Sequence, residues 1–236
     1  MNKGFGIGLL AMALLVPGAT VATAQTTQSV NLGVGWFMLR GEESRDADDV
    51  LLEDLQSLAF DVSDFNGALL NGEWLIAFGD RVEVGLGAGF YQRTVPSVYA
   101  NFVDADGSEI EQDLKLRIVP VTATVKFLPF GRPGDFQPYA GGGIALLNWN
   151  YSEVGEFVDF FDGGTIFRDR YVASGNTIAP IIFGGVRVPV GGDVFAVNGE
   201  IRWQGGKGDL PESSGLLTDT LDLGGISVIG SFQIRF

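Results

Sequence analysis

The side chains that most often carry enzyme chemistry are scarce in this sequence. None of its 236 residues is histidine or cysteine. A Ser-His-Asp triad, a thiolate nucleophile and a zinc site built from Cys and His are therefore excluded. The nearest approach to a metal site is the acidic turn with Asp104, Asp106 and Glu109, but no acid stands where the first ligand of an EF-hand loop would be. We predict no cofactor and no resident metal, with these acids as weak calcium candidates only.

Charge and glycine content narrow the choice of partner. The chain has 15 basic and 29 acidic residues and a net charge of −14, which argues against a nucleic-acid partner. Its 35 glycines form neither the dinucleotide-binding nor the P-loop fingerprint. The nearest candidate for a phosphate loop is Gly205-Gly206-Lys207-Gly208, which we interpret as a flexible surface turn.

The N-terminal segment has the pattern of a secretory signal peptide. Lys3 precedes an apolar run at 5–16, and Ala22-Thr23-Ala24 forms a small-x-small cleavage site before Gln25. The run is too short for a spanning helix, which needs about 20 apolar residues. We therefore predict a signal peptide at 1–24 and one exported domain at 25–236.

The elements that must position the remaining polar residues are strands, because apolar and polar residues alternate with period two from residue 30 onward. Eight stretches show this alternation or an apolar variant of it, at 30–38, 68–78, 82–93, 114–127, 137–149, 178–190, 195–204 and 226–236. The stretches at 114–127 and 137–149 are apolar on both faces, so their facing stays ambiguous. Short links alternate with long connections at 41–64, 94–113, 152–175 and 205–222, which carry net charges of −8, −5, −3 and −3. The excess acidity therefore lies at one end of the molecule.

Period two fits both a soluble barrel and a membrane barrel with its apolar side turned to lipid. The membrane alternative is favoured because the polar face is mostly glycine with few charges, too few for a solvated surface. Aromatic residues also stand near both ends of the stretches, as the two lipid–water interfaces require. The predicted interface aromatics are Trp36, Phe78, Trp149, Phe195, Trp203 and Phe236.

These patterns resemble the small outer-membrane β-barrels of the OmpA-domain, OmpX and OmpW kind. Pro138-Tyr139-Ala140-Gly141-Gly142-Gly143 is similar to the opening of the fifth strand in that group, and the alternating Phe232-x-Ile234-x-Phe236 resembles its assembly signal. The resemblance implies an all-β fold: an eight-stranded antiparallel up-and-down transmembrane β-barrel with four long acidic outer loops and three short periplasmic turns. It also implies location in the outer membrane, contact with its lipid and lipopolysaccharide, and insertion by the barrel-assembly machinery through the strand ending at Phe236.

Charged residues on the inward face would share a narrow lumen. The candidates are Glu73, Glu83, Arg93, Arg187, Glu200, Arg202 and Arg235. Inward glycines would leave room for these long side chains. Two interpretations stay open, a structural network of ion pairs and a selectivity constriction.

Two outer connections contain signals of their own. The segment 50–58 has the spacing of a short surface helix that folds over the mouth, and Asp162-Gly163-Gly164 between β-prone runs predicts a hairpin. The acidic loops could also attract divalent cations.

Enzymes known on small outer-membrane barrels mostly depend on histidine, so we predict that this protein is not an enzyme. We expect a structural or surface-interaction role with a largely filled lumen. The alternative is a narrow channel for small or apolar solutes.

Overall fold

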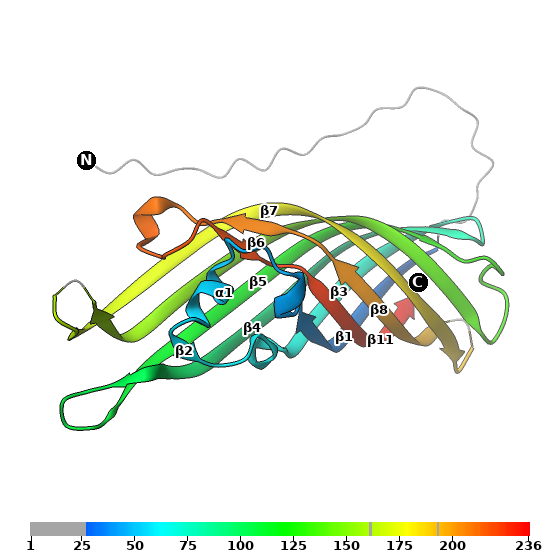
Figure 1. Cartoon of the computed structure of the whole chain (residues 1–236). Coiled ribbons are helices and arrows are strands. Elements are labelled where there is room, and N and C mark those ends of the chain that lie inside the picture. The colour runs from blue at the N-terminus through cyan, green and yellow to red at the C-terminus, as the bar shows by residue number, and fades with distance from the viewer. Residues whose placement is uncertain (1–26, 161, 193) are drawn as a thin grey trace, which may run out of the picture.

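The computed structural model describes residues 27–160, 162–192 and 194–236, so the predicted signal peptide lies outside the described residues. Eight antiparallel strands close into a ring in the order β4-β3-β1-β11-β8-β7-β6-β5, and β5 pairs back with β4 (Figure 1). The ring strands are β1 (Gln28–Leu39), β3 (Gly67–Phe78), β4 (Val82–Val103), β5 (Glu109–Phe127), β6 (Gln137–Asp159), β7 (Thr165–Val190), β8 (Phe195–Gln204) and β11 (Gly225–Arg235). The predicted eight-stranded up-and-down barrel is confirmed.

The strands differ in length in a way that a bilayer explains. β1, β3, β8 and β11 have 12, 12, 10 and 11 residues, close to the roughly 9–11 that cross a membrane. β4, β5, β6 and β7 have 22, 19, 23 and 26. Their surplus projects beyond one end of the barrel as two long hairpins (Figure 1). The predicted hairpin is confirmed, and its turn uses Gly163 and Gly164 at positive φ.

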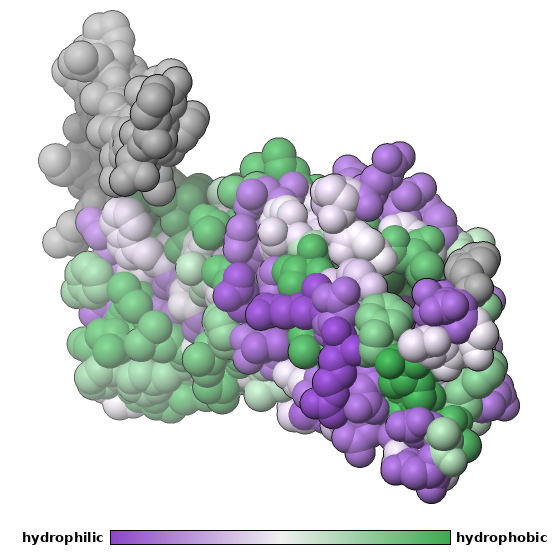
Figure 2. Space-filling view, turned by 90° about the vertical axis from the view of Figure 1, so that its left-hand side faces the viewer, coloured by the Kyte–Doolittle hydropathy of each residue, from purple (hydrophilic) through white to green (hydrophobic). Residues whose placement is uncertain are grey.

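The barrel wall is apolar on its outside. Outward residues such as Val34, Val125 and Ile178 are more than half exposed, whereas Thr124 and Lys126 of the same β5 are buried inside, which settles the ambiguous facing of that strand. Figure 2 looks onto the end with the long hairpins: hydrophilic residues dominate that end, and hydrophobic residues cover the flank behind it. An apolar outer wall on a closed sheet is the arrangement that hydrocarbon requires.

Short elements fill the outer end, where the hairpins project. The first loop contains η1 (Glu42–Ser44), α1 (Val50–Asp54), β2 (Leu58–Ala59) and η2 (Val62–Phe65), and the last contains β9 (Lys207–Asp209), η3 (Glu212–Ser214) and β10 (Thr220–Asp222). The helix expected at 50–58 is present only over Val50–Asp54, as α1. Val50 and Leu51 are fully buried, so it packs into the mouth instead of lying on the surface. In the described ranges, no helix has the length and apolar content to cross a membrane.

Candidate functional site

Six charged side chains fill the barrel interior on the side of the short turns. We call them the charge network; each is at most 8% exposed. They are Glu73 on β3, Glu83 on β4, Lys126 on β5, Arg187 on β7, and Glu200 and Arg202 on β8. Each points inward because its strand turns the alternate, apolar residues toward lipid. Three carboxylates face three cations, so the network is neutral as a whole.

Arg187 and Glu83 form one ion pair of the network. The guanidinium Nη1 and Nη2 donate to the two Glu83 carboxylate oxygens at 2.8 and 2.7 Å, a bidentate pair that crosses the lumen from β7 to β4. Arg187 Nε donates to Asn198 Oδ1 at 3.1 Å, and the Asn198 amide donates to Asn31 and Ser231. All three guanidinium nitrogens and both carboxylate oxygens of this pair thereby have a partner, which favours burial of the two charges.

The other four charges form a connected chain. Lys126 Nζ lies 2.6 Å from a Glu73 carboxylate oxygen and 3.6 Å from Glu200. Glu200 accepts from Arg202 Nε and Nη2 at 2.9 and 2.7 Å and from the Tyr139 hydroxyl at 3.0 Å. The Lys126 ammonium also lies 5.1 Å from the centre of the Tyr139 ring, a cation–π distance. The lumen at this depth is thus crossed by charge-assisted contacts.

Glycine on β4 makes room for the network. A Cβ on Gly85 would lie 2.4 Å from the Thr124 hydroxyl and 2.6 Å from a Glu73 oxygen. Thr124 itself donates to Glu73 at 2.7 Å. The alternating glycines of this strand therefore serve the long side chains of its neighbours.

The sequence-predicted lumen charges separate into two groups. Glu73, Glu83, Arg187, Glu200 and Arg202 lie in the network, although Arg202 pairs with Glu200 and not with Glu73 or Glu83. The predicted set lacks Lys126, because the stretch 114–127 is apolar on both faces. The alternation Thr122-x-Thr124-x-Lys126 was the signal that could have found it.

Two predicted lumen residues lie elsewhere. Arg93 shares the inward parity of β4, but it lies beyond Tyr91, the last residue of β4 that pairs with β3. The side chain is exposed and donates to the Asp64 carbonyl at 2.8 Å, so its assignment to the lumen network is corrected. Arg235 lies at the end with the short turns and donates to Gln137 Oε1 at 3.0 Å.

The opposite half of the interior is closed by apolar side chains from the first and last loops. We call them the outer cap: Val50, Leu51, Leu58, Val62, Phe65, Leu210, Leu221 and Leu223, all buried. They pack in one cluster with inward residues of the projecting strands, among them Leu114, Leu116 and Tyr151. Burial of this many apolar side chains is the main stabilisation of the cap.

Ion pairs tie the two cap loops together. Arg45 donates to the Asp49 carboxylate at 2.8 and 3.1 Å and to the Asp222 carbonyl at 2.9 Å. Arg40 pairs with the Asp222 carboxylate at 2.8 Å, and Asp49 also accepts from the N–H groups of Leu51 and Asp222. Part of the acidity of these loops is therefore buried and structural, and it joins the loops instead of driving them apart.

The prediction that Trp149 lies at the lipid interface is wrong. The side chain lies inside, 1% exposed, in the same cluster as the cap. A Cβ on Gly208 would lie 2.5 Å from its ring, so the run 205–208 is a close-packed contact and not a flexible surface turn. The other predicted interface aromatics all face outward, namely Trp36, Phe78, Phe195, Trp203 and Phe236.

Space between the network and the cap is small. A cavity of about 40 Å³ lies there, lined by Phe37, Tyr91, Arg202 and Ile229 among others. A water molecule occupies about 30 Å³ in the liquid. This cavity has room for a water molecule but not for an organic solute.

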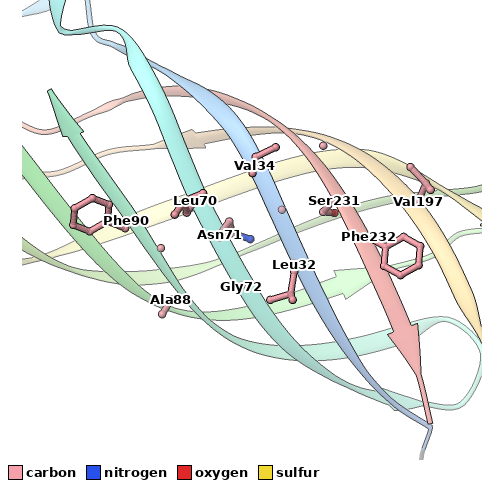
Figure 3. A pocket seen from close by; sticks show the side chains of 13 residues that line it. Leu32, Val34, Leu70, Asn71, Gly72, Ala88, Phe90, Val197, Ser231 and Phe232 are labelled. Atoms are coloured by element: carbon pink, nitrogen blue, oxygen red, sulfur yellow. The ribbon is translucent and has the colours of Figure 1, made fainter.

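A much larger hollow lies on the lipid side of the wall. It has a volume of about 860 Å³, with Gly72, Ala88 and Gly230 among the residues that line it. Figure 3 shows Leu32, Leu70, Phe90 and Phe232 around it, contributed by β1, β3, β4 and β11. Its lining is almost entirely apolar, which suits the acyl chains of the surrounding lipid.

The acidic turn on the β4–β5 hairpin uses its carboxylates for local structure. Asp104 and Asp106 accept from the backbone N–H groups of Ala105 and Ser108 at 2.5 and 2.9 Å. The Ser108 N–H holds the pKa of Asp106 below its usual value. In the part of the chain that the structure describes, no group of three or more acidic side chains is placed to hold a metal ion.

A closed eight-stranded sheet with an apolar outer wall, strands of bilayer length and short turns at one end defines a small outer-membrane β-barrel. The outer membrane is the location that this architecture serves. No protein-family model and no curated protein sequence matches the chain.

Solved structures resemble it in fold. OprG of Pseudomonas aeruginosa is 12% identical, covers 89% of this chain and 96% of its own, and has a TM-score of 0.50. The neisserial surface protein NspA is 10% identical with the same coverage and a TM-score of 0.44. Ail of Yersinia pestis, in complex with the heparin analogue sucrose octasulfate, is 13% identical, covers 89% of this chain and 99% of its own, with a TM-score of 0.42. The OprG similarity supports the barrel fold.

Proposed function

We propose that this protein is a closed barrel that acts through its outer surface, in a structural or surface-interaction role, and not as a solute channel. The observation that carries the proposal is the double closure of the lumen. The charge network fills one half, and the outer cap covers the other. A chain without histidine or cysteine also lacks the usual nucleophile–base pairs, so the proposed role is not enzymatic.

Ion passage would require separation of pairs such as Glu83–Arg187, whose charged atoms lie 2.7 Å apart and are buried inside the barrel. Leaving one member of a buried pair without its partner costs about 3–5 kcal/mol. Passage would also require displacement of the apolar cap. Both barriers support a closed ground state over the alternative of a narrow channel.

Planar bilayer recording tests the proposal. Purified protein inserted in a lipid bilayer should give no stepwise conductance above that of the bare membrane. An open porin from the same preparation is the positive control for insertion. Regular steps of nanosiemens size from the unmodified chain would instead establish the channel alternative.

The lipid-facing wall and the end of β11 suggest partners within the envelope. The outward Phe232, Ile234 and Phe236 form an apolar row at the C-terminal strand, which we propose the barrel-assembly machinery recognises. Lipopolysaccharide is the proposed neighbour of the upper wall. Removal of the Phe236 ring by F236A should slow folding into vesicles that contain the machinery more than folding into bare lipid.

Exposed acids at the outer end also support divalent cation binding as a diffuse effect of the local field. Millimolar Mg²⁺ should slow amide exchange in the outer loops at low salt, and less so at high salt. Loop exchange that ignores Mg²⁺ at low salt would remove this part of the proposal.

A further inference from the structure

A second cavity lies at the outer end, away from the lumen. It has a volume of about 320 Å³ and opens between the projecting strands and the loops. Aromatic rings from three strands line it: Tyr99 of β4, Phe157 of β6 and Tyr171 of β7. Phe157 and Tyr171 meet edge to face, with ring centres 4.7 Å apart. This volume lies within the usual range for small-molecule sites, and such sites are mostly apolar with a few placed polar groups.

The charged side chains in this cavity are acidic. The described residues that line it include Asp54, Glu153 and Asp159 but no lysine or arginine. The carboxyl groups of Asp54 and Glu153 lie close enough for each to influence the pKa of the other, and the Tyr151 hydroxyl donates to Asp54 Oδ2 at 2.8 Å. Among the described residues, no basic side chain forms an ion pair with Asp54 or Glu153. A buried carboxylate without a cation is costly, so the cavity favours a positively charged guest.

Two buried acceptor atoms at this cavity lack a donor. Glu153 Oε1 and Gln112 Oε1 have no hydrogen-bond partner within the described ranges, although their residues are only 7% and 3% exposed. The Gln112 amide nitrogen donates to the Glu156 carbonyl at 2.9 Å and to the Tyr99 hydroxyl at 3.3 Å. These donations fix the orientation of the amide, so its oxygen is left to accept. The missing group is therefore an N–H or O–H donor.

We propose that this cavity binds a primary organic ammonium ion. Its N–H groups would donate to Glu153 Oε1 and Gln112 Oε1, and its positive charge would replace the absent basic side chain. Its apolar tail would lie against the rings of Phe157 and Tyr171, which also favour a nearby cation. The inference deepens the proposed surface role and rests on it, since it names a class of ligand for the outer surface.

The protonation of Asp54 and Glu153 should make ammonium binding depend on pH. Burial raises the pKa of Glu153, and the Asp54 charge raises it further. Burial likewise raises the pKa of Asp54, with the charges of Asp49 and Glu53 adding to the effect. The other titratable groups around the pair are Asp159 and the hydroxyls of Tyr99, Tyr151 and Tyr171. An ammonium guest displaces the proton that the pair holds, so binding strengthens as pH rises while the amine stays charged.

Isothermal titration calorimetry of the full barrel in maltoside micelles tests the assignment. The probe is phenethylammonium, compared with the neutral phenethyl alcohol and with phenethyltrimethylammonium, which keeps the charge but has no N–H. We expect phenethylammonium to bind most tightly, the trimethyl analogue more weakly and the alcohol most weakly. E153Q should weaken phenethylammonium about tenfold or more. The matched control E111Q, on the exposed face of β5 beside Gln112, should leave it unchanged.

Y171L is a second, independent test in case E153Q fails to fold, because it removes one aromatic ring of the cavity and keeps the acid pair. It should weaken phenethylammonium several-fold while the heat-modified gel mobility of the barrel stays native. Equal affinity for the alcohol, no effect of E153Q in a folded barrel, or no binding of phenethylammonium would overturn the inference. Binding of Ca²⁺ in its place would also overturn it. A bilayer recording of the same sample separates the two failures, since a silent barrel without amine binding removes only this inference.

Discussion

Arg187 is fully enclosed, and the value of its ion pair depends on both partners being present. R187A leaves the Glu83 carboxylate buried without its bidentate donor. We expect a loss of about 3–5 kcal/mol in the free energy of unfolding, measured by reversible urea unfolding from lipid vesicles. The double variant E83A/R187A removes both charges and should recover part of that loss.

The exposed pair Arg168–Glu156 on the outer hairpin is the matched control. Its contact is of similar length, 2.9 Å, but the arginine side chain is 82% exposed. R168A should cost at most about 1 kcal/mol. Additive losses in the Glu83–Arg187 cycle would contradict the buried pairing.

Glu153 gives the outer end a pH dependence of stability. Its pKa is raised in the folded protein by burial and by Asp54. The folded state therefore holds a proton that the unfolded chain releases at lower pH. The resulting stabilisation is complete below the unfolded pKa of a glutamate and is lost as pH rises through the raised folded pKa. Protection of cap amides from exchange, corrected for intrinsic rates, should fall between acidic and mildly alkaline pH.

E153Q keeps the shape of the side chain and removes its titration. The same exchange measurement on E153Q should show a flatter pH profile, and E111Q should show the original one. A profile in E153Q that matches the unmodified protein would place the titrating group elsewhere.

At the scale of elements, β1 and β11 approach so closely that position 35 requires glycine, whereas position 230 has room for a larger side chain. A Cβ on Gly35 would lie 2.4 Å from the Val228 carbonyl oxygen, whereas a Cβ on Gly230 meets nothing within 4 Å. G35A should cost about 1–3 kcal/mol through overpacking. G230A, on the lipid side of the same strand pair, should be neutral or gain about 0.5–1 kcal/mol. Urea unfolding from vesicles measures both, and equal effects would show that this contact is not as tight as described.

The strand pattern was predictable from sequence wherever lipid enforces it. Val34, Ile201 and Val228 must be apolar because they face hydrocarbon, so their spacing reveals the strands and their facing. Beyond the membrane this constraint ends. The extension of β4 and β5 carries outward polar residues such as Thr94 and Asp113. These residues lie in the segment 94–113, which the sequence pattern predicts to be a connection. The β6–β7 extension was predictable only because Asp162-Gly163-Gly164 marks its turn.

The candidate site was predictable in part, for the same reason. Inward charges stand out when they alternate with lipid-facing residues, as Glu200 and Arg202 do. Lys126 was missed because its strand also carries apolar inward residues, Leu114 and Leu116, which pack under the cap. Trp149 was misplaced for a related reason: two loops distant in sequence make the outer half of the interior apolar. Periodicity carries no information about that tertiary contact.

For the whole molecule, the interior divides into two closures in series, and each excludes ions by different physics. The charge network holds its groups by pairing, so ions compete with fixed partners for them. The outer cap excludes ions because its buried apolar side chains offer no ligands. A series arrangement conducts only when both closures are open, since the remaining one dominates the resistance.

The last prediction follows from this series arrangement. The network variant E73A/K126A removes the 2.6 Å pair and opens space among the inward glycines. Recorded in planar bilayers, it should remain silent because the cap is intact. Replacement of residues 42–64 by a short Gly-Ser turn removes half of the outer cap side chains. The charge network still blocks the lumen, so this variant should also remain silent. Only the combination should give stepwise conductance, with little preference for cations or anions because the remaining pairs Glu83–Arg187 and Glu200–Arg202 are each neutral. Conductance from the network variant alone would mean that the cap leaks, and conductance from the loop replacement alone would mean that the paired charges form a pore.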